Sequence, residues 1–282
     1  NSFGAGSSKI GSLGVVTINL PRLANKCKEN DLDFYDEIKK TVEDIAKINN
    51  AKRHIIKRRI ENGSQPLYTL GFMDLNKQYS TVGLTGINEA VNILGYDILK
   101  DDGVNFVLGM LGIINFTNDK MQKRYKAPHN CEQVPAENSA IKLASKDKLI
   151  GLDFGINFYS NQFIPLITKA DMLDRIKLQG IFDKHFSGGA ICHINIEEQI
   201  KDRYFMKSII ELCAKRGVVY FAINYNIQSC EDLHMSVGRN TICQMCGKPI
   251  IQNFTRVVGF LTNKNLWHTV RRNEDYMERQ WY

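Results

Sequence analysis

The sequence predicts an α/β fold, because apolar runs typical of buried strands alternate with segments that carry a helical hydrophobic period. Residues 13–20 form an apolar run rich in β-branched side chains, which favours a buried strand. Residues 31–59 repeat apolar side chains every three or four positions between charged ones, which favours a long helix. Residues 200–216 also follow a helical period, Gly217 closes them, and the apolar run 218–224 follows. Alternation of this kind is typical of sheets with parallel strands.

The segments between these landmarks continue the alternation with shorter patterns. Glycines mark several expected helix starts, and no internal repeat or low-complexity linker interrupts the chain. The further predicted elements are a strand at 67–73, a turn at 83–86, helices at 87–94 and 103–116, an irregular stretch at 125–137, a helix from Ser139, a helix at 171–182 and a strand at 190–196. His193, within the last strand, is expected to be a core histidine with satisfied hydrogen bonds.

The composition is that of a globular chain with free thiols. With 282 residues and 43% hydrophobic content, the chain can bury a large core. No run of about 18 apolar residues and no signal peptide is visible, so we expect neither a membrane span nor secretion, and the cytoplasm is the default location. Seven cysteines, an odd number, favour metal-binding or redox thiols over a disulfide framework. The net charge of +7 suits a nucleotide ligand and equally suits an ordinary basic surface.

A glycine near the end of the sequence is its most informative residue. Residues 256–261 read Arg-Val-Val-Gly-Phe-Leu and follow a Cys-x-x-Cys pair, an arrangement similar to a glycyl radical site. A radical on the Cα of Gly259 would share its electron with the flanking amide nitrogen and carbonyl, and without a side chain the centre can flatten. The alternative is an ordinary turn or close-packing glycine.

A cysteine pair, Cys243 and Cys246 followed by Gly247, has the spacing of a metal-binding knuckle. Cys230 and His234 lie upstream and complete a set of three sulfurs and one imidazole, which suits a closed tetrahedral zinc site. Two alternatives stay open. In the first, His234 is only a solvated loop residue. In the second, the Cys243 and Cys246 thiols form a redox dithiol without metal.

Four segments, in this order along the chain, resemble the anaerobic (class III) ribonucleoside triphosphate reductases. They are residues 14–22 (GVVTINLPR), 83–90 (GLTGINEA), 130–138 (NCEQVPAEN) and the cysteine pair with its RVVGFL loop. The resemblance implies the second half of a ten-stranded α/β barrel of the glycyl radical enzyme and ribonucleotide reductase type over residues 1–225. It also implies a small zinc-binding and glycyl radical module over residues 226–282. The family usually has a second Cys-x-x-Cys where this chain has Cys230 and His234.

The resemblance also implies a radical mechanism with several partners. Gly259 would store the radical and pass it to a cysteine that abstracts the ribose 3′ hydrogen of a ribonucleoside triphosphate. Residues 1–13, where the family pattern places that cysteine, contain none, and Cys27 does not match. The chain is therefore expected to be part of a split or truncated enzyme that is inactive without an upstream N-terminal half. Further implied partners are an iron–sulfur activating enzyme that uses S-adenosylmethionine, a thiol reductant or formate, and a second copy in a homodimer.

Residues 130–138 are the best candidate for substrate chemistry, since they place a thiol, two carboxylates and an amide just before a predicted helix. We expect Cys131 to deliver reducing equivalents or to interact with an external thiol reductant, and Glu132 to act as an acid or base during loss of the 2′ hydroxyl. Cys131 favours a thiol-reduced subtype over a formate-using one, and the alternative for it is a buried apolar role. Asn19 matches the family position that touches the ribose hydroxyls, and its alternative is a strand-terminating turn residue.

The predicted substrate-binding residues are Glu137, Asn138, Ser139 and Ala140. The last three would offer backbone N–H groups at a helix N-terminus, which is a natural phosphate site. Simple helix capping by Glu137, Asn138 and Ser139 is the alternative. The tail at 267–282 is expected to be a packing element over the radical loop.

Three classes of function follow from these features. The first is anaerobic reduction of ribonucleoside triphosphates to deoxyribonucleoside triphosphates, the supply step for DNA replication. The second is another glycyl radical enzyme of the pyruvate formate-lyase type, which the cysteine pair and the PAEN helix start disfavour. The third is a non-enzymatic zinc-ribbon protein that binds nucleic acid, although the knuckle lacks the clustered basic and aromatic residues that such binding prefers.

Overall fold

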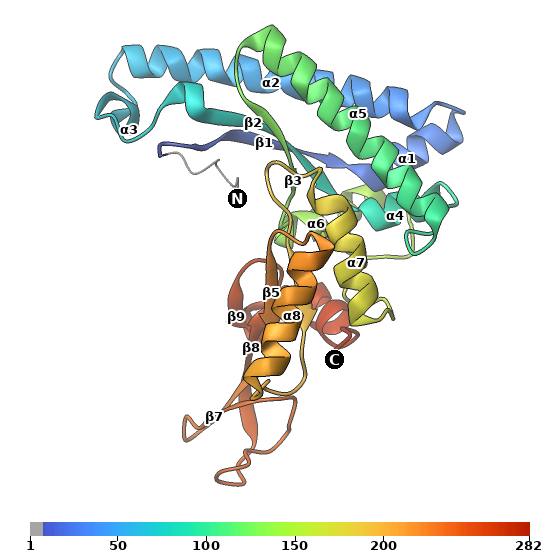
Figure 1. Ribbon diagram of the computed structural model, residues 1–282, viewed down its shortest axis with the longest axis vertical. Helices are drawn as coiled ribbons and strands as arrows, with labels where there is room; N and C mark the ends of the chain where they lie inside the picture. Colours follow the sequence, from blue (N-terminus) through green and yellow to red (C-terminus); the bar gives the residue numbers. More distant parts are fainter. Residues whose placement is uncertain (1–7) are drawn as a thin grey trace. The chain divides into compact units, whose positions relative to one another are not determined.

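The computed structural model describes residues 8–282 and has a mixed α/β architecture (Figure 1). The contacts within the chain divide it into two compact units. One unit runs to Val134 and takes in Phe182–Ala190, and the other consists of Pro135–Ile181 and Ile191–Tyr282. The predicted boundary near residue 225 divides the chain differently and stays a prediction. Within residues 8–282, no helix combines the length and apolar character that crossing a membrane requires.

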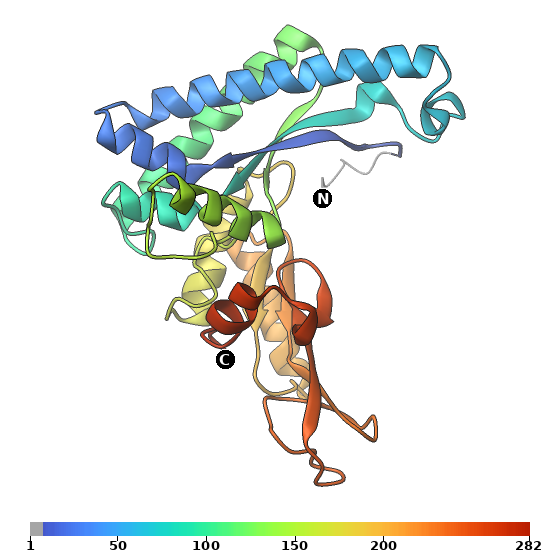
Figure 2. The same cartoon turned by 180° about the vertical axis from the view of Figure 1, so that it is seen from behind.

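The first unit is built on a parallel sheet in the order β1-β2-β3. Its strands are β1 (Gly11–Asn19), β2 (Gln78–Thr85) and β3 (His129–Gln133). Its helices are α1 (Leu20–Glu29), α2 (Phe34–Glu61), α3 (Pro66–Thr69), α4 (Ile87–Ile93) and α5 (Asp101–Tyr125), with a 3-10 turn η1 (Leu75–Lys77). The long helices α2 and α5 pack against each other on one side of the sheet (Figures 1 and 2).

The apolar stripe of α2 explains why this helix lies on the sheet. Ile38, Val42 and Ile45 recur at helical spacing and are buried, as the periodicity of residues 31–59 predicts. The stripe ends after Asn49, and Ile55 is 44% exposed. Asp33 caps the start of the helix by accepting a hydrogen bond from the N–H of Asp36 at 2.8 Å. The helix predicted from the hydrophobic period is thus confirmed.

Three predictions for the first unit are wrong. Residues 67–73 form the short helix α3 and a turn instead of a strand, because Pro66 fixes a helical φ and its carbonyl accepts from the N–H of Leu70 at 2.9 Å. Residues 83–85 belong to β2 and not to a turn, and the predicted irregular stretch 125–137 contains β3. Both strands carry buried polar side chains, so a hydrophobic pattern could not reveal them.

The predicted strand at 13–20 is confirmed as β1, but it is only partly buried. Leu13 and Ile18 are buried, whereas Val15 is 43% exposed. β1 lies at one edge of the three-stranded sheet, which explains the exposure. The strand ends where α1 begins. Pro21 occupies the first turn of this helix, where its missing N–H costs nothing.

The second unit combines a parallel strand pair with an antiparallel sheet. Its helices are α6 (Glu137–Leu149), α7 (Met172–Asp183), which ends at the boundary, and α8 (Arg203–Arg216). The parallel pair is β4 (Cys192–Asn195) with β5 (Phe221–Asn224). The antiparallel sheet has the order β7-β6-β8-β9, with β6 (Ile227–Cys230), β7 (Met235–Val237), β8 (Ile250–Arg256) and β9 (Leu261–Asn263), and short helical turns η2 (Lys264–Leu266) and η3 (Arg271–Tyr276) follow.

Most predictions for the second unit are confirmed, with shifted ends. The predicted helices at 171–182 and 200–216 correspond to α7 and α8, and Gly217 ends α8 with a left-handed φ of 84°. The predicted strands correspond to β4 and β5. Gly180 is required by packing, because a Cβ there would lie 1.8 Å from the carbonyl oxygen of Arg216. This close approach brings α7 onto the end of α8.

Candidate functional site

Gly259 lies in the turn between β8 and β9, where the Val257 N–H donates to the carbonyl of Phe260 at 3.0 Å. The Gly259 N–H donates to Oε1 of Glu137 at 3.0 Å, and the Phe260 N–H donates to the same oxygen at 3.2 Å. Nη1 of Arg256 donates to the Gly259 carbonyl at 2.5 Å. Charged side chains therefore hold both polar groups that flank the Gly259 Cα.

The backbone does not require a glycine at position 259. Gly259 is not among the residues with a positive φ, in contrast to Gly247. A Cβ on Gly259 would meet Oε1 of Glu137 at 3.6 Å and Cβ of Pro135 at 3.7 Å, which are ordinary van der Waals contacts. Neither a left-handed turn nor close packing accounts for glycine here, so both structural alternatives lose their support.

The C-terminal tail holds the same loop through a buried ion network. Arg279 donates from Nη1 to the Arg256 carbonyl at 2.6 Å and from Nη2 to the Val257 carbonyl at 2.5 Å. Asp275 accepts from Arg271 at 2.8 Å and from Arg279 at 2.7 Å. Burial opposes ionisation of Asp275, but the two guanidinium groups outweigh it and hold the pKa of this carboxyl below its ordinary value. Sequence reasoning missed this network, although its i, i+4 spacing was a signal.

Aromatic side chains complete the support of the loop. Trp267 and Tyr276 form a buried cluster with Val257, and Trp281 packs against it. The Trp267 and Tyr276 rings meet edge to face at 5.9 Å, and the Arg279 guanidinium lies 5.0 Å from the Trp267 ring centre. The prediction that the tail is a packing element is therefore confirmed.

The four predicted metal ligands come together in the second unit. The ligand atoms of Cys230, His234, Cys243 and Cys246 all lie within 4.8 Å of one another. Sγ of Cys230 is 3.7 Å from Sγ of Cys246, and Sγ of Cys243 is 3.9 Å from Nδ1 of His234. With zinc–sulfur bonds of about 2.3 Å, two sulfurs of a tetrahedral site lie about 3.8 Å apart. The arrangement therefore fits one ion of the size of zinc.

The backbone of the knuckle turns through a left-handed conformation at its glycine, as the Cys-x-x-Cys-Gly pattern predicts. Gly247 has a left-handed φ of 74°, and its N–H donates to the carbonyl of Cys243 at 2.9 Å. The Cys243 N–H donates to the carbonyl of Lys248 at 2.8 Å, which closes the loop around the two thiols. His234 joins this cluster, so it is not simply a solvated loop residue. The redox dithiol alternative stays open.

The candidate substrate residues of the first unit lie near the carboxyl ends of its strands. Asn19 ends β1, and its side chain accepts from the Arg22 N–H at 3.2 Å as the N-cap of α1. Cys131 and Glu132 are successive residues of β3, so their side chains point to opposite faces of the sheet. Glu132 is opposite Gly83 in the register of the sheet.

Cys131 is completely buried. It is opposite the buried Val82 in the register of β2 and β3. Burial is the main cause that raises the pKa of this thiol far above its usual range, and the nearby Glu132 adds to it. This environment disfavours a thiolate and supports the alternative of a buried apolar role.

The predicted phosphate site lies at the start of α6, in the second unit. Ala136 is the N-cap, without a side-chain hydrogen bond, and Glu137 turns its carboxylate to the Gly259 loop. The capping alternative for Glu137 is therefore wrong. Asn138 and Ser139 are exposed, but the Ala140 N–H already donates to the Ala136 carbonyl at 3.0 Å within the helix. That amide is consequently not available to a phosphate in this conformation.

His193 is a core residue whose hydrogen bonds are only partly satisfied, which corrects the prediction. Its Nδ1 lies 3.0 Å from Nδ2 of Asn224, which donates to it. Its Nε2 is buried without a partner among residues 8–282. Burial, followed by the positive charges of Arg279 and Arg256, lowers the pKa of His193 to about 3.

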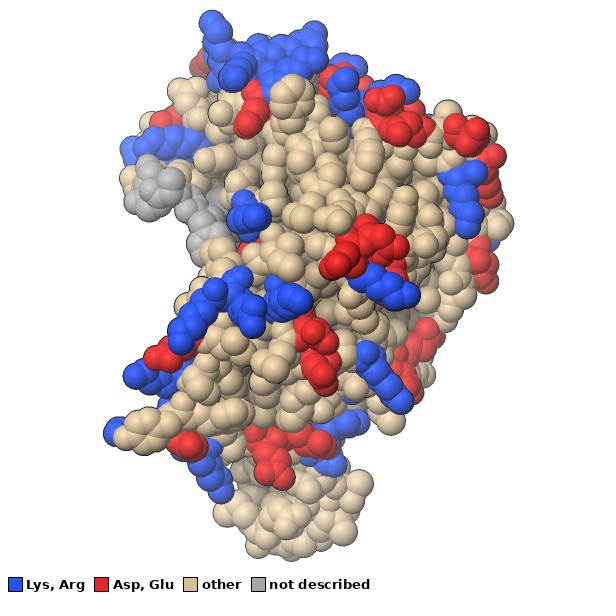
Figure 3. Space-filling view, turned by 45° about the vertical axis from the view of Figure 1, so that its right-hand side comes forward, with Lys and Arg blue, Asp and Glu red and all other residues tan. Residues whose placement is uncertain are grey.

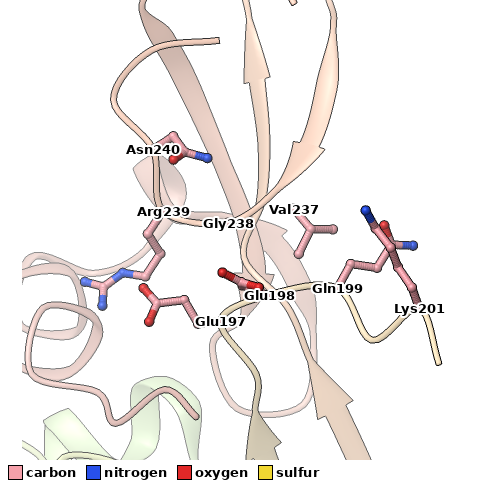
Figure 4. A pocket seen from close by; sticks show the side chains of 8 residues that line it. All are labelled: Glu197, Glu198, Gln199, Lys201, Val237, Gly238, Arg239 and Asn240. Atoms are coloured by element: carbon pink, nitrogen blue, oxygen red, sulfur yellow. The ribbon is translucent and has the colours of Figure 1, made fainter. Parts of the chain in front are cut away.

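A polar hollow of about 410 Å³ lies elsewhere in the second unit, between the segments that follow β4 and β7 (Figure 4). Its lining residues are Glu197, Glu198, Gln199, Lys201, Val237, Gly238, Arg239 and Asn240. The Arg239 guanidinium, which Figure 4 shows near the Glu197 carboxylate, also lies 5.7 Å from the ring centres of Tyr276 and Trp281. Acidic and basic groups alternate in this hollow, so no ligand class follows from its charge.

A family model described as anaerobic ribonucleoside-triphosphate reductase matches residues 2–282. The chain belongs to this family. A curated anaerobic ribonucleoside-triphosphate reductase from Haemophilus influenzae is 22% identical in an alignment of 275 positions that covers 84% of this chain and 37% of that protein.

Solved structures of the reductase family agree with this membership. A structure titled anaerobic ribonucleotide reductase has a TM-score of 0.89 and 38% identity, over 97% of this chain and 45% of its own. The Thermotoga maritima anaerobic ribonucleotide reductase in complex with dATP and CTP has a TM-score of 0.83 and 37% identity, over 96% of this chain and 46% of its own. The chain thus spans less than half the length of each of these reductases.

Proposed function

We propose that this chain is the C-terminal catalytic part of an anaerobic ribonucleoside-triphosphate reductase and that Gly259 carries its radical. One observation carries the proposal: a glycine stands where neither φ nor packing requires one, in a loop held by charged side chains. Since neither φ nor packing explains this glycine, we assign it a chemical use. Family membership supplies the class of reaction, which is reduction of ribonucleoside triphosphates to deoxyribonucleoside triphosphates under anaerobic conditions.

The upstream half of the enzyme is part of this proposal. It would supply the cysteine that receives the radical, and the chain alone would be inactive. The parallel sheets β1-β2-β3 and β4-β5 would belong to the second half of a ten-stranded barrel, with residues 226–282 as the radical and zinc module. An iron–sulfur activating enzyme would remove one hydrogen atom from the Gly259 Cα and transfer it to a radical derived from S-adenosylmethionine. A homodimer of the full enzyme in the cytoplasm completes the proposal.

Asn19 and Glu132 are the proposed contacts to the ribose. Parallel strands present their carboxyl ends at the same edge of the sheet, and both residues lie at such ends, on β1 and β3. Glu132 would act as the acid or base, and Asn19 would bind the hydroxyls. Gly83 lies between Thr17 and Glu132 in the register, and the side chains of Val134 and Thr17 fill the space that a Cβ on Gly83 would need.

The reductant is proposed to be a thiol or formate, and substitution of Cys131 distinguishes between the two. If Cys131 delivers reducing equivalents, Cys131→Ala abolishes thiol-dependent turnover while leaving the Gly259 radical intact. If it is a packing residue, Cys131→Ala keeps turnover and lowers only stability. The burial of this thiol supports the second outcome.

The triphosphate is proposed to bind at the start of α6, where Asn138 and Ser139 are exposed at the positive end of the helix dipole. The sequence predicts Ala140 with them, but its N–H already donates within the helix, so this residue is not part of the proposed phosphate site. Glu137, although predicted as a substrate ligand, is better supported as a ligand of the Gly259 loop.

Zinc is the proposed metal at Cys230, His234, Cys243 and Cys246. Three sulfurs and one imidazole form a closed ligand set, which is typical of structural zinc. Such an ion would hold the β6 end and the β7–β8 connection together, and it would supply no redox chemistry.

A pyruvate formate-lyase type of enzyme and a zinc-ribbon nucleic-acid binder are the remaining candidates. The reductase match over nearly the whole chain weighs against both. On the face in Figure 3, basic side chains stand in separate groups with acidic ones between them, whereas nucleic-acid binding favours a continuous basic stripe.

Substrate turnover tests the proposal. The chain is assembled with its upstream half, activated anaerobically, and incubated with each of the four ribonucleoside triphosphates or with pyruvate and coenzyme A. We expect deoxyribonucleotide products from the wild type and none from Gly259→Ala. Acetyl-coenzyme A as the product would support the second candidate, and radical formation without either product would refute the reductase assignment.

A further inference from the structure

We propose that Glu137 and Arg256 are positioning residues that polarise the two groups flanking the Gly259 Cα and thereby stabilise a radical on that carbon. The inference rests on the proposed function and adds residues that spacing in the sequence did not reveal. Its basis is one arrangement: an anionic oxygen lies 3.0 Å from the Gly259 nitrogen, and a cationic nitrogen lies 2.5 Å from the Gly259 oxygen.

The two charges act in the direction that a Cα radical needs. Such a radical is stabilised when the amide nitrogen donates electron density to the carbon and the carbonyl withdraws it. A hydrogen bond from the N–H to a carboxylate makes the nitrogen a better donor, because it increases the electron density on that nitrogen. A hydrogen bond from a guanidinium makes the carbonyl a better acceptor. Exchanging the two charges would have the opposite effect, so the signs themselves support the inference.

The strength of these contacts follows from their charge. Hydrogen bonds with an ionised partner are roughly twice as strong as neutral ones. The Gly259 loop is partly shielded from water, and Glu137 and Arg256 are only partly exposed, so solvent screens these contacts less than it would at an open surface. The Phe260 N–H shares the Glu137 oxygen at the longer distance of 3.2 Å, which fixes the position of the carboxylate.

The surrounding structure holds both charged groups in place. Glu137 is the first residue of α6, and its carbonyl accepts from Nη2 of Arg271 at 3.4 Å. The backbone of Arg256 is held through its carbonyl by Arg279 at 2.6 Å. Because Arg271 and Arg279 share Asp275, one ion network orients both positioning residues.

A purely mechanical clasp is the competing explanation, and electron spin distribution separates the two. The assembled enzyme is activated as wild type, Glu137→Gln and Arg256→Gln, with isotopically labelled nitrogen and carbonyl carbon in glycine. Exposed residues serve as matched controls, in the variants Glu278→Gln and Arg203→Gln. The hyperfine couplings of the radical and its anaerobic lifetime are measured. Hydrogen exchange of the Gly259 and Phe260 amides in the unactivated proteins reports whether the loop stays closed.

We expect a lower spin density on nitrogen in Glu137→Gln and on the carbonyl carbon in Arg256→Gln, each with a several-fold shorter lifetime. The controls should match the wild type. A clasp that merely opens would lose radical without redistributing the remaining spin, so unchanged couplings overturn the inference even if the yield falls. If a variant consumes S-adenosylmethionine at the wild-type rate but accumulates no radical, hydrogen exchange decides: wild-type protection of the Gly259 and Phe260 amides supports the inference, and faster exchange overturns it in favour of the clasp.

The same experiment separates this inference from the function on which it rests. A wild-type protein that forms no radical on Gly259 overturns both. A wild-type radical with couplings and lifetime unchanged in both variants overturns only the polarisation by Glu137 and Arg256.

Discussion

The Cys/His cluster and the Gly259 loop belong to the same unit, but they are assembled over very different distances along the chain. The sulfurs of Cys230 and Cys246 come from positions 16 apart, within one stretch of hairpin. The Gly259 N–H is held by Glu137, 122 positions away. The Cys/His cluster is therefore assembled locally, whereas the loop depends on the tertiary fold.

This difference predicts how each site fails. A local cluster should survive disruption of the tail, because its four ligands need only β6, β7 and the knuckle. The loop should open when the tail is disturbed, because Arg279 and Asp275 hold it from outside the hairpin. Changes directed at one site should leave the other intact.

The largest expected effect is loss of the metal in Cys243→Ser. Structural zinc sites bind with an apparent free energy of about 10 kcal/mol or more, and three ligands cannot reproduce four. We expect the wild type to retain about one zinc per chain against a chelator, while Cys243→Ser retains none. Elemental analysis after dialysis measures this. Cys27→Ser, in the other unit, is the control and should keep its zinc, and a full zinc equivalent in Cys243→Ser would contradict the assignment.

The next largest effect concerns the ion network under the loop. Asp275→Asn leaves two buried guanidinium groups without their carboxylate, which costs about 3–5 kcal/mol of unfolding free energy. Chemical denaturation gives this value, and hydrogen exchange should show faster exchange at Val257 and Gly259. Zinc content should not change. Glu278→Gln on the same tail is the matched control and should be as stable as the wild type. An Asp275→Asn variant as stable as the wild type would show that the ion network does not stabilise the fold.

Acid should weaken the second unit through His193. The folded-state pKa is about 3 and the ordinary value 6.5, so the unfolded chain binds more protons between these values. Stability contributed by the neutral imidazole is fully present above pH 6.5 and is lost as pH falls towards 3, at up to about 1.4 kcal/mol per pH unit. The free energy of unfolding is measured from pH 7 to 4. His193→Gln should show a flatter slope than the wild type, whereas His268→Asn, which replaces an exposed histidine, should keep the wild-type slope.

The smallest structural effect is expected at the most important residue. Gly259→Ala meets only ordinary contacts at a φ outside the left-handed region, so stability should stay within about 1 kcal/mol of wild type. Thermal unfolding measures this. A loss of several kcal/mol would restore the close-packing explanation for this glycine and remove the main support for a chemical role.

Sequence reasoning found what is local and missed what is distant. The spacing of Cys243 and Cys246 predicts a knuckle, and the period of residues 31–59 predicts α2, because both depend on neighbours along the chain. β3 was missed because its five residues, His-Asn-Cys-Glu-Gln, are polar, and only pairing with β2 makes them a strand. The hydrogen bond from Gly259 to Glu137 could not be predicted from either residue, since it exists only once α6 and the β8–β9 turn meet.

Exposure of the activated enzyme to air would reveal a radical on Gly259, because oxygen cuts a polypeptide at a glycyl radical. The chain, assembled with its upstream half, is treated anaerobically with an activating enzyme, exposed to air and examined by intact mass. We expect a cut at Gly259 in the wild type and in Glu278→Gln, and none in Gly259→Ala. An uncut wild-type chain, with folding, assembly and activating-enzyme turnover verified, would contradict the claim that Gly259 carries a radical.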